Sequence, residues 1–373
     1  MPAENRPEHL ASEEPGSPRL YCPLPSLSNP SAAALERGSV GWMKTAAFGA
    51  SSAVQERLRV FAAAYFVARF LPLAPVGPAL QIASDWNYWA LRFDDEYCDA
   101  EAQPGDLAAV LGRLVRVVEV PSLTMFDDNP HVRALRDLAQ RAEHHLSPVL
   151  MRRWAEAHRR WAQATQWQVA SRAAGRLPSL GEFCLFRGGA SYAPQLTTLI
   201  EIANGIELTE AEILRPAVRA LTELTWLYLG WSNDLMSHRK ETLLHEDDQN
   251  ILTVVAGELP GTPMEQGVAL CDRLMCLYLA LREDIRPTAS QALRRYVDDL
   301  GNCMRAQLEW GASVQRYTLS DDKSKTVLTL TPNQTVPADL AALPIPEISW
   351  WWDLLPAGRS AALVASPPER GTP

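Results

Sequence analysis

The stretch AEILRPAVRALTELTWLYLGWSNDLMSHRKE, residues 211–241, shows the pattern that decides the fold. Apolar residues recur every three or four positions along it, and helix-favouring Ala, Leu, Arg and Glu dominate. The same pattern occurs at 54–71, 106–120, 147–174, 262–285 and 290–317. No steady series of alternating β-branched segments interrupts these stretches. The sequence therefore predicts an all-α protein.

The bulk composition favours a sizeable folded core. The chain has 373 residues, is 47% hydrophobic and carries a formal net charge of −9. This hydrophobic content is enough for a large core. Nucleic acids and anionic membrane surfaces bind basic patches, so we expect neither as a partner of this acidic chain.

The ends of the chain differ from its middle. Residues 1–19 are polar and proline-rich, which predicts a disordered arm. Residues 20–30 are too rich in proline for a helix and are expected to form an extended lead-in. The helical pattern runs from about 31 to 319, and residues 20–320 are expected to form the folded domain. Residues 321–373 contain many prolines and no sustained period, which predicts a mostly irregular tail. We find neither an export signal nor an apolar run of about 18 residues, and therefore expect a cytoplasmic protein without a membrane span.

Three oxygen-bearing side chains follow one another at helical spacing near the end of the opening stretch. Asn233, Ser237 and Glu241 stand at positions i, i+4 and i+8. On a helix these positions lie along one face, successive residues being about 6 Å apart. A small hard cation such as Mg²⁺ prefers oxygen ligands and completes its shell with waters and substrate phosphates. The spacing indicates a magnesium site, although an ordinary polar helix face would give the same pattern.

A second cluster of carboxylates lies in RFDDEYCDAE, residues 92–101. Asp94 and Asp95 are adjacent, and Asp99 follows Asp95 by one helical turn. The apolar segment before them, from about Ala79, is expected to be a buried helix with its acidic end at the mouth of a cavity. Taken alone, the stretch is explained equally well by a solvated acidic turn. Because both motifs occur in one helical chain, we favour a metal site shared by two helices.

These motifs resemble the pattern of bacterial class I terpene synthases. That family combines F-DDxxxD, NDxxSxxKE and a terminal Arg-Tyr pair, which correspond here to residues 93–99, 233–241 and 316–317. The resemblance spans residues 20–320. A shorter likeness, in LYCP and DDEYCD, is to 2-methylisoborneol-type synthases. The resemblance implies a single-domain α-helical bundle around a central active-site cavity.

The resemblance also implies an arginine that senses diphosphate. The family places it at a fixed distance before the motif asparagine, and counting back from Asn233 gives Arg187. Ala190 and Ser191 stand where the family often has Asp, Ser or Thr followed by Gly, so the effector residue is not identified. Trp310 matches an aromatic residue that the family places under the reacting carbons.

The remaining roles are carried over in the same way. The resemblance implies that three Mg²⁺ ions are held by Asp94, Asp99, Asn233, Ser237 and Glu241. It implies that the substrate diphosphate is bound by Arg187, Lys240, Arg316 and Tyr317. Asp95 is expected to anchor Arg187 or Arg316. The implied catalytic residues are Asp94, Arg187, Trp310, Arg316 and Tyr317.

The implied reaction is ionisation of a linear prenyl diphosphate and cyclisation of the resulting carbocation. The cavity must exclude water, and aromatic faces can stabilise a cation without attacking it. Candidate lining aromatics are Trp86, Trp89, Phe186, Trp226 and Trp310.

The substrate best supported by the family is farnesyl diphosphate, giving a sesquiterpene. Geranyl, 2-methylgeranyl and geranylgeranyl diphosphates stay open, because the sequence does not give the cavity volume. A chain-elongating prenyl transferase would show a second aspartate-rich motif in place of Asn233, Ser237 and Glu241. A nucleoside-triphosphate pyrophosphatase and a non-catalytic helical scaffold are the alternatives of other classes. We expect a monomer or a homodimer.

Overall fold

The computed structural model describes most of the chain between the two ends. The described residues are 18–46, 48, 58, 60–98, 103–124, 128–244, 249–314, 328–332 and 340–356. The side chains of residues 239, 240 and 242–244 are outside this description. Most of the expected N-terminal arm and much of the expected tail therefore lie outside the described residues.

The described residues form helices and one short pair of strands. In chain order the elements are β1 (Arg19–Tyr21), α1 (Ala32–Thr45), α3 (Ala63–Phe70), α4 (Pro78–Phe93), a π-helical turn (Asp94–Cys98), α5 (Pro104–Glu119), α6 (Pro130–Glu143), α7 (Pro148–Ala173), α8 (Leu180–Ala190), α9 (Ala193–Asn204), α10 (Glu210–Ile213), α11 (Pro216–Leu244), α12 (Ile251–Glu258), α13 (Pro263–Ile285), a 3₁₀ turn (Arg286–Thr288), α14 (Gln291–Ser313), β2 (Thr329–Thr331), α15 (Pro346–Ser349) and a second 3₁₀ turn (Trp352–Leu354). The expectation of an all-α protein is confirmed.

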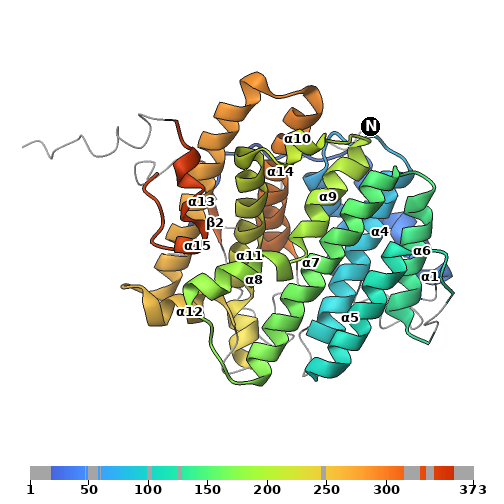
Figure 1. Ribbon diagram of the computed structural model, residues 1–373, viewed down its shortest axis with the longest axis horizontal. Helices are drawn as coiled ribbons and strands as arrows, with labels where there is room; N and C mark the ends of the chain where they lie inside the picture. The colour runs from blue at the N-terminus through green and yellow to red at the C-terminus, as the bar shows by residue number, and fades with distance from the viewer. Residues whose placement is uncertain are drawn as a thin grey trace, which may run out of the picture.

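The long helices pack side by side into a bundle (Figure 1). Helices α5 and α6 lie on one side, α12 and α13 on the other, and α8, α11 and α14 between them. Helix α11 packs against α8, α13 and α14, so both sides of the bundle meet along it. Among the described helices none is long and apolar enough to cross a membrane.

The sequence sets the starts of these helices through capping residues. Several begin behind Asn, Ser or Thr side chains that accept a backbone N–H of the first turn, at Asn129, Ser147, Ser179, Thr209, Asn250, Thr262 and Ser290. At α8, the Ser179 side chain accepts the N–H of Glu182, and the Glu182 carboxylate accepts the N–H of Ser179. This reciprocal cap fixes the start of the helix that carries Arg187.

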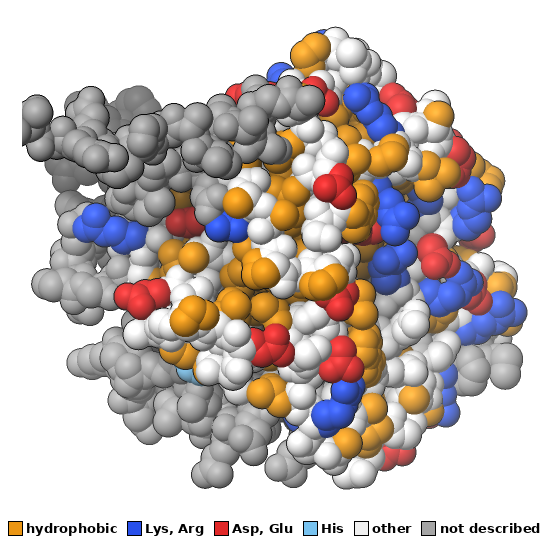
Figure 2. Space-filling model, turned by 60° about the vertical axis from the view of Figure 1, so that its left-hand side comes forward, with side chains coloured by type: hydrophobic (Ala, Val, Ile, Leu, Met, Phe, Trp, Pro, Cys, Tyr) orange, Lys and Arg blue, Asp and Glu red, His pale blue; other side chains and the backbone are white. Residues whose placement is uncertain are grey.

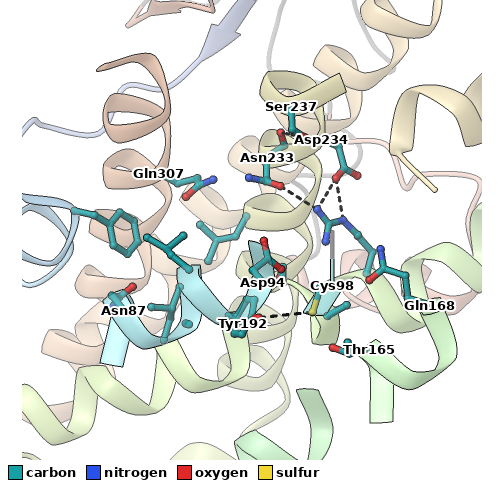
Figure 3. Close-up of a pocket in the computed structure, with 18 of the residues that line it drawn as sticks. Asn87, Asp94, Cys98, Thr165, Gln168, Tyr192, Asn233, Asp234, Ser237 and Gln307 are labelled. Atoms are coloured by element: carbon teal, nitrogen blue, oxygen red, sulfur yellow. Dashed lines mark hydrogen bonds and ion pairs between the residues drawn. The ribbon is translucent and has the colours of Figure 1, made fainter. Parts of the chain in front are cut away.

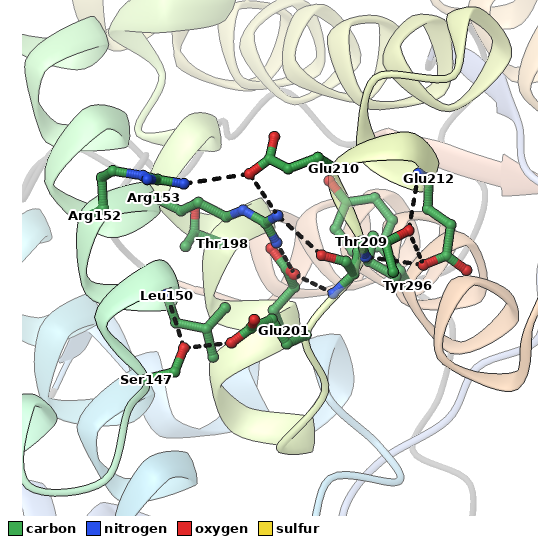
Figure 4. A network of polar contacts seen from close by, with 12 residues as sticks. Ser147, Leu150, Arg152, Arg153, Thr198, Glu201, Thr209, Glu210, Glu212 and Tyr296 are labelled. Carbon is green, nitrogen blue, oxygen red and sulfur yellow. Dashed lines mark hydrogen bonds and ion pairs between the residues drawn. The ribbon is translucent and has the colours of Figure 1, made fainter.

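A buried ion pair joins α7 to α9 and α10 (Figure 4). Arg153 donates to the Glu201 carboxylate at 2.7 Å and to the Leu208 carbonyl at 2.9 Å, and the Leu208 N–H donates to Glu201 at 2.9 Å. Burial raises the pKa of Glu201, whereas the Leu208 N–H and Arg153 favour its charged form. The carboxylate therefore fixes both the end of α9 and the direction of the loop that follows.

The start of the described chain is joined to a segment beyond the last long helix. Strand β1 pairs in parallel with β2, with Arg19 opposite Thr329 and Tyr21 opposite Thr331. The N–H of Tyr21 also donates to Asp272 of α13 at 2.8 Å. The expectation of an extended segment after residue 20 therefore agrees with the structure, and that segment begins as a strand.

The described part of the tail is docked on the bundle. Trp351 and Trp352 are buried, and the Trp351 indole N–H donates to Glu223 of α11 at 3.4 Å. The Arg219 guanidinium lies over the Trp350 ring at 5.6 Å. Figure 2 turns the side of α13 and α15 toward the viewer and shows apolar side chains among charged ones across its middle.

We predict that Asp272→Asn stabilises the protein at pH 7.5 and has a much smaller effect at pH 4. Burial raises the pKa of Asp272 to about 6, so the folded state binds a proton more tightly than the unfolded state. The cost of the buried charge is therefore complete above pH 6, decreases as the pH falls below 6, and is mostly gone near pH 4, where the carboxyl of the unfolded chain, with its ordinary pKa of 3.8, is also becoming protonated. Asparagine keeps the acceptor for Tyr21, and we expect a gain of about 1–2 kcal/mol at pH 7.5. Thermal unfolding at the two pH values measures it; an equal effect at both would contradict the prediction.

Candidate active site

A cavity of about 150 Å³ lies between α3, α4, α7, α8, α9, α11 and α14 (Figure 3). Its lining is divided by chemistry. Charged and polar side chains come from the π-helical turn, α7, α8 and α11, whereas α3, α4, α9 and α14 supply mainly apolar and aromatic ones. Such a cavity can hold a ligand with an anionic head and a hydrocarbon body.

Both predicted motifs line this one cavity. Asp94 reaches it from the end of α4, and Asn233, Ser237 and Glu241 reach it from α11. Because α11 continues unbroken to Leu244, the three α11 residues share one helix face, as their spacing predicts. The solvated-turn interpretation of Asp94 is wrong, since its side chain lies on the wall opposite α11 (Figure 3).

The donor atoms of this cluster suit a hard cation. Carboxylates of Asp94 and Glu241, the amide of Asn233 and the hydroxyl of Ser237 offer oxygen ligands, the kind that Mg²⁺ prefers. Among the residues that the structure describes, no group of three His, Cys, Asp or Glu side chains could hold a metal ion. The set that fits is therefore a mixed one, in which an amide and a hydroxyl supplement the carboxylates.

Asn250, which caps α12, holds part of this cluster in place. Its Nδ2 donates to Glu241 at 2.7 Å and to the Asp234 carbonyl at 3.0 Å. Its Oδ1 accepts the N–H of Leu252 at 2.9 Å. Sequence analysis did not identify Asn250, because a helix cap gives no sign that it also contacts a distant helix.

Arg187 forms a buried ion pair with Asp234 beside the cluster. Its Nε donates to Asp234 Oδ1 at 3.0 Å, and a terminal nitrogen donates to Asn233 Oδ1 at 3.2 Å. Burial alone would lower the pKa of Arg187, but the charge of Asp234 outweighs it and the pKa is raised. The guanidinium is therefore permanently charged at the rim of the oxygen cluster.

Two further features support this ion pair. The second oxygen of Asp234 accepts the N–H of Ile251 at 3.0 Å, so the carboxylate joins α8, α11 and α12. A side chain at Gly230 would meet Arg187 Cγ at 3.1 Å, so the small residue there makes room for the arginine.

Asp95 was expected to anchor Arg187 or Arg316. Arg187 is instead held by Asp234, and Arg316 lies outside the described residues.

Hydrogen bonds from α6 and its N-cap residue hold the π-helical turn (Asp94–Cys98) in place. His131 donates to Glu96 at 2.7 Å, and the Asn129 amide donates to the Tyr97 hydroxyl at 2.9 Å. Burial would raise the pKa of Glu96, but the hydrogen bonds from His131 and Arg92 lower it to about 2. Burial lowers the pKa of His131, so a neutral imidazole meets a charged carboxylate. These contacts therefore stabilise the π-helical turn that contains Asp94, a geometry often found at functional sites.

Two of the five aromatic candidates line the cavity, namely Trp86 and Trp310. Trp89, Phe186 and Trp226 were expected there and are not among its lining residues. Each packs elsewhere: the Trp89 N–H donates to the His131 carbonyl, Phe186 contacts Trp167, and the Trp226 N–H donates to Thr197. Spacing along one helix does not decide which side of a large ring faces a cavity.

Two aromatic lining residues, Phe66 and Tyr192, were not predicted from the sequence. Tyr192 links α8 to α9 with a φ of 60°, a left-handed conformation unusual for a non-glycine residue and costly to hold. Its ring lies 5.0 Å from that of Trp161 and 6.2 Å from that of Trp86. Ala190 and Ser191, at the expected effector position, also line the cavity.

The ring of Trp86 is fixed by a buried histidine. Its indole N–H donates to His158 Nε2 at 3.1 Å, and the other ring nitrogen of His158 lies 2.8 Å from the Trp154 carbonyl. Burial lowers the pKa of His158 to about 4, so the imidazole is neutral at pH 7 and accepts the indole proton. Trp86 therefore presents its ring to the cavity in one orientation.

Some predicted site residues cannot be located. Asp99, Arg316 and Tyr317 lie outside the described residues, and the side chain of Lys240 does too. Their roles stay predictions from the resemblance.

Comparison with known proteins agrees with this geometry. The family model "Terpene synthase family 2, C-terminal metal binding" matches residues 85–280. Bonnadiene synthase of Allokutzneria albata is 34% identical over 90% of this chain and 97% of its own length. Spiroviolene synthase of Streptomyces violens is 32% identical over 90% of this chain and 96% of its own.

Solved structures give the same result. The SVS_A2 protein from ancestral sequence reconstruction is 31% identical and superposes with a TM-score of 0.78 over 90% of this chain and 98% of its own. Cucumene synthase, at 23% identity, shares the fold with a TM-score of 0.65 over 78% of this chain and 98% of its own. The chain belongs to the terpene synthase family, and the resemblance identified from its motifs is confirmed. It is accordingly an enzyme of the terpene synthase class, built as an α-helical bundle around its cavity, and its family is a metal-binding one.

We predict that Asp234→Ala lowers the free energy of unfolding by about 3–5 kcal/mol, because it leaves Arg187 as a buried charge without its carboxylate. Urea denaturation without metal or substrate measures this. Asp128→Ala is the matched control, since its ion pair with Arg113, at 3.5 Å, is exposed and should contribute less than about 1 kcal/mol. Similar small losses in both variants would contradict the prediction.

Proposed function

We propose that this terpene synthase is a Mg²⁺-dependent cyclase that ionises a linear prenyl diphosphate and closes the carbocation into a ring system, with release of diphosphate. The observation that carries the proposal is the convergence of Asp94, Arg187 and the Asn233–Ser237–Glu241 face on one cavity whose walls at α3, α4, α9 and α14 are largely apolar. An anionic head group fits the first part and an isoprenoid chain fits the second.

The metal ligands of the proposal are Asp94, Asp99, Asn233, Ser237 and Glu241, holding three ions. Magnesium, when bound, supplies Lewis-acid and electrostatic assistance to the departing diphosphate. Arg187 then binds the diphosphate from its fixed place beside Asn233, together with Lys240, Arg316 and Tyr317. Because Arg187 is already oriented by Asp234, little conformational freedom is lost when the anion binds.

The apolar walls fold the substrate chain and exclude water. Trp86 and Trp310 present aromatic faces to the cavity, and Phe66 lies 5.8 Å from Trp310, ring centre to ring centre. Aromatic faces attract a cation through their quadrupole and are not nucleophiles. Both indole N–H groups point away from the substrate, toward His158 and the Phe61 carbonyl, so neither presents a polar hydrogen to it.

Farnesyl diphosphate is the substrate we propose, giving a sesquiterpene. The (+)-T-muurolol synthase of Streptomyces clavuligerus, 32% identical over 89% of this chain, is described as cyclising (2E,6E)-farnesyl diphosphate. Geranyl, 2-methylgeranyl and geranylgeranyl diphosphates are the alternatives for the same chemistry. Cytoplasmic location, a monomeric or homodimeric state and the absence of a nucleic-acid partner stay predictions from the sequence.

Incubation of the purified protein and Mg²⁺ with the C10, 2-methyl-C10, C15 and C20 diphosphates tests the substrate. We expect the C15 substrate to give the highest diphosphate release, with a cyclic product in the gas chromatogram. A longer diphosphate formed when isopentenyl diphosphate is added would favour a chain-elongating prenyl transferase. Absence of diphosphate release from every substrate would overturn the proposal.

The proposed ligands are tested by Asp94→Ala and Asn233→Ala. We expect each to reduce diphosphate release by about 100-fold or more, since each removes charge or dipole stabilisation of the leaving group. The circular dichroism spectrum should stay that of the parent protein. Asp128→Ala, an exposed aspartate away from the cavity, should retain full activity.

Metal removal gives an independent test. Dialysis against EDTA should abolish diphosphate release, and added Mg²⁺ should restore it. Isothermal titration of the metal-free protein with Mg²⁺ and inorganic diphosphate should show binding that Asn233→Ala weakens. Turnover that persists in EDTA would rule out the metal-dependent mechanism.

A further inference from the structure

Two amide side chains interrupt the apolar part of the cavity. Asn87 of α4 and Gln307 of α14 line it, and they are only 6% and 9% exposed. Helix α3 packs against both α4 and α14, so the two amides enter the cavity from helices that share a neighbour. Exclusion of water from a carbocation requires no polar side chains in this part of the cavity, so the two amides need another explanation.

The amides leave hydrogen-bonding capacity directed at the cavity. Asn87 uses its Nδ2 to donate to the Ala83 carbonyl at 2.8 Å, which leaves its Oδ1 as an acceptor. Within the described part of the chain, Gln307 makes no hydrogen bond with its side chain. A buried polar atom without a partner costs about 1–3 kcal/mol, so a polar partner inside the cavity would satisfy both Asn87 Oδ1 and the Gln307 amide.

These amides lie apart from the diphosphate-binding residues. In the view of Figure 3, Asn87 and Gln307 lie at the left of the cavity, whereas Asp234 and Gln168 lie at its right. Asn87 also precedes Asp94 by two helical turns, about 10 Å along α4. A partner held by Asn87 and Gln307 would therefore meet the hydrocarbon chain, not the leaving group.

We propose that Asn87 and Gln307 hold a water molecule that captures the final carbocation, so that the product is a terpene alcohol. This inference rests on the proposed cyclase function. A water between the two amides accepts a hydrogen bond from Gln307 Nε2 and donates one to Asn87 Oδ1, which meets the two to four polar partners that a buried water needs.

The chemistry balances with water as the only added reactant. One lone pair of the water accepts the Gln307 hydrogen bond, and the other forms the new C–O bond to the cationic carbon. The oxonium ion then loses a proton, with the released diphosphate as the final acceptor. Prenyl diphosphate and water thus give a cyclic alcohol and protonated diphosphate, with no oxidant or reductant.

Turnover in water enriched with ¹⁸O tests the proposal. The protein is incubated with Mg²⁺ and the prenyl diphosphate that gives the highest diphosphate release, and the extract is analysed by gas chromatography and mass spectrometry. We expect a cyclic alcohol as a main product, carrying ¹⁸O. Diphosphate release with hydrocarbon products alone would overturn the water site and leave the cyclase function standing, whereas absence of diphosphate release would overturn both.

Substitutions then test the two residues. Asn87→Leu and Gln307→Met keep similar size and remove the polar atoms, so the ratio of alcohol to hydrocarbon should fall about tenfold in each. Because both products come from one turnover mixture, the ratio does not depend on the amount of folded protein. Gln291→Met, at an exposed position of the same helix α14, should leave the ratio unchanged. An unchanged ratio in both cavity variants would overturn the assignment.

Discussion

The active-site end of the bundle depends on the ion pair between Arg187 and Asp234. Two charges almost fully removed from water are stable only when each has its partner and its remaining hydrogen bonds. Here those bonds go to Asn233, to the Gly230 carbonyl and to the N–H of Ile251. The pair therefore fixes α8, α11 and α12 relative to one another, and the oxygen-bearing face of α11 takes its position from that arrangement.

Much of the fold and part of the site follow from sequence alone. The period of 211–241 predicts a long helix, and a long straight helix must place Asn233, Ser237 and Glu241 on one face, because that is a property of the backbone. Membership of the terpene synthase family was likewise readable from two short motifs. These motifs do not identify the carboxylate that forms the ion pair with Arg187. Asp234 is separated from it by a whole helix, and Asp95 satisfied the local pattern equally well.

The cavity lining was the least predictable part. Trp89 and Trp86 lie on the same helix, yet only Trp86 lines the cavity: its N–H donates to His158 of α7, whereas that of Trp89 donates to the His131 carbonyl of α6. Phe66 and Tyr192 gave no sequence signal: one is an ordinary apolar position, and the other depends on the break between α8 and α9. Aromatic side chains are placed by tertiary packing, which a single sequence does not contain.

The parallel pairing of β1 with β2 has a consequence for how this chain is made. Strand β1 is synthesised before the described helices, and its partner lies beyond the last long helix. During translation the backbone N–H and C=O groups of β1 therefore bind water until β2 has been synthesised and the helices between β1 and β2 have packed together. Closing so large a loop is entropically slow, and it is efficient only after the helices have brought the two ends together. We therefore expect β1 and β2 to pair late in folding, after the helical bundle has formed.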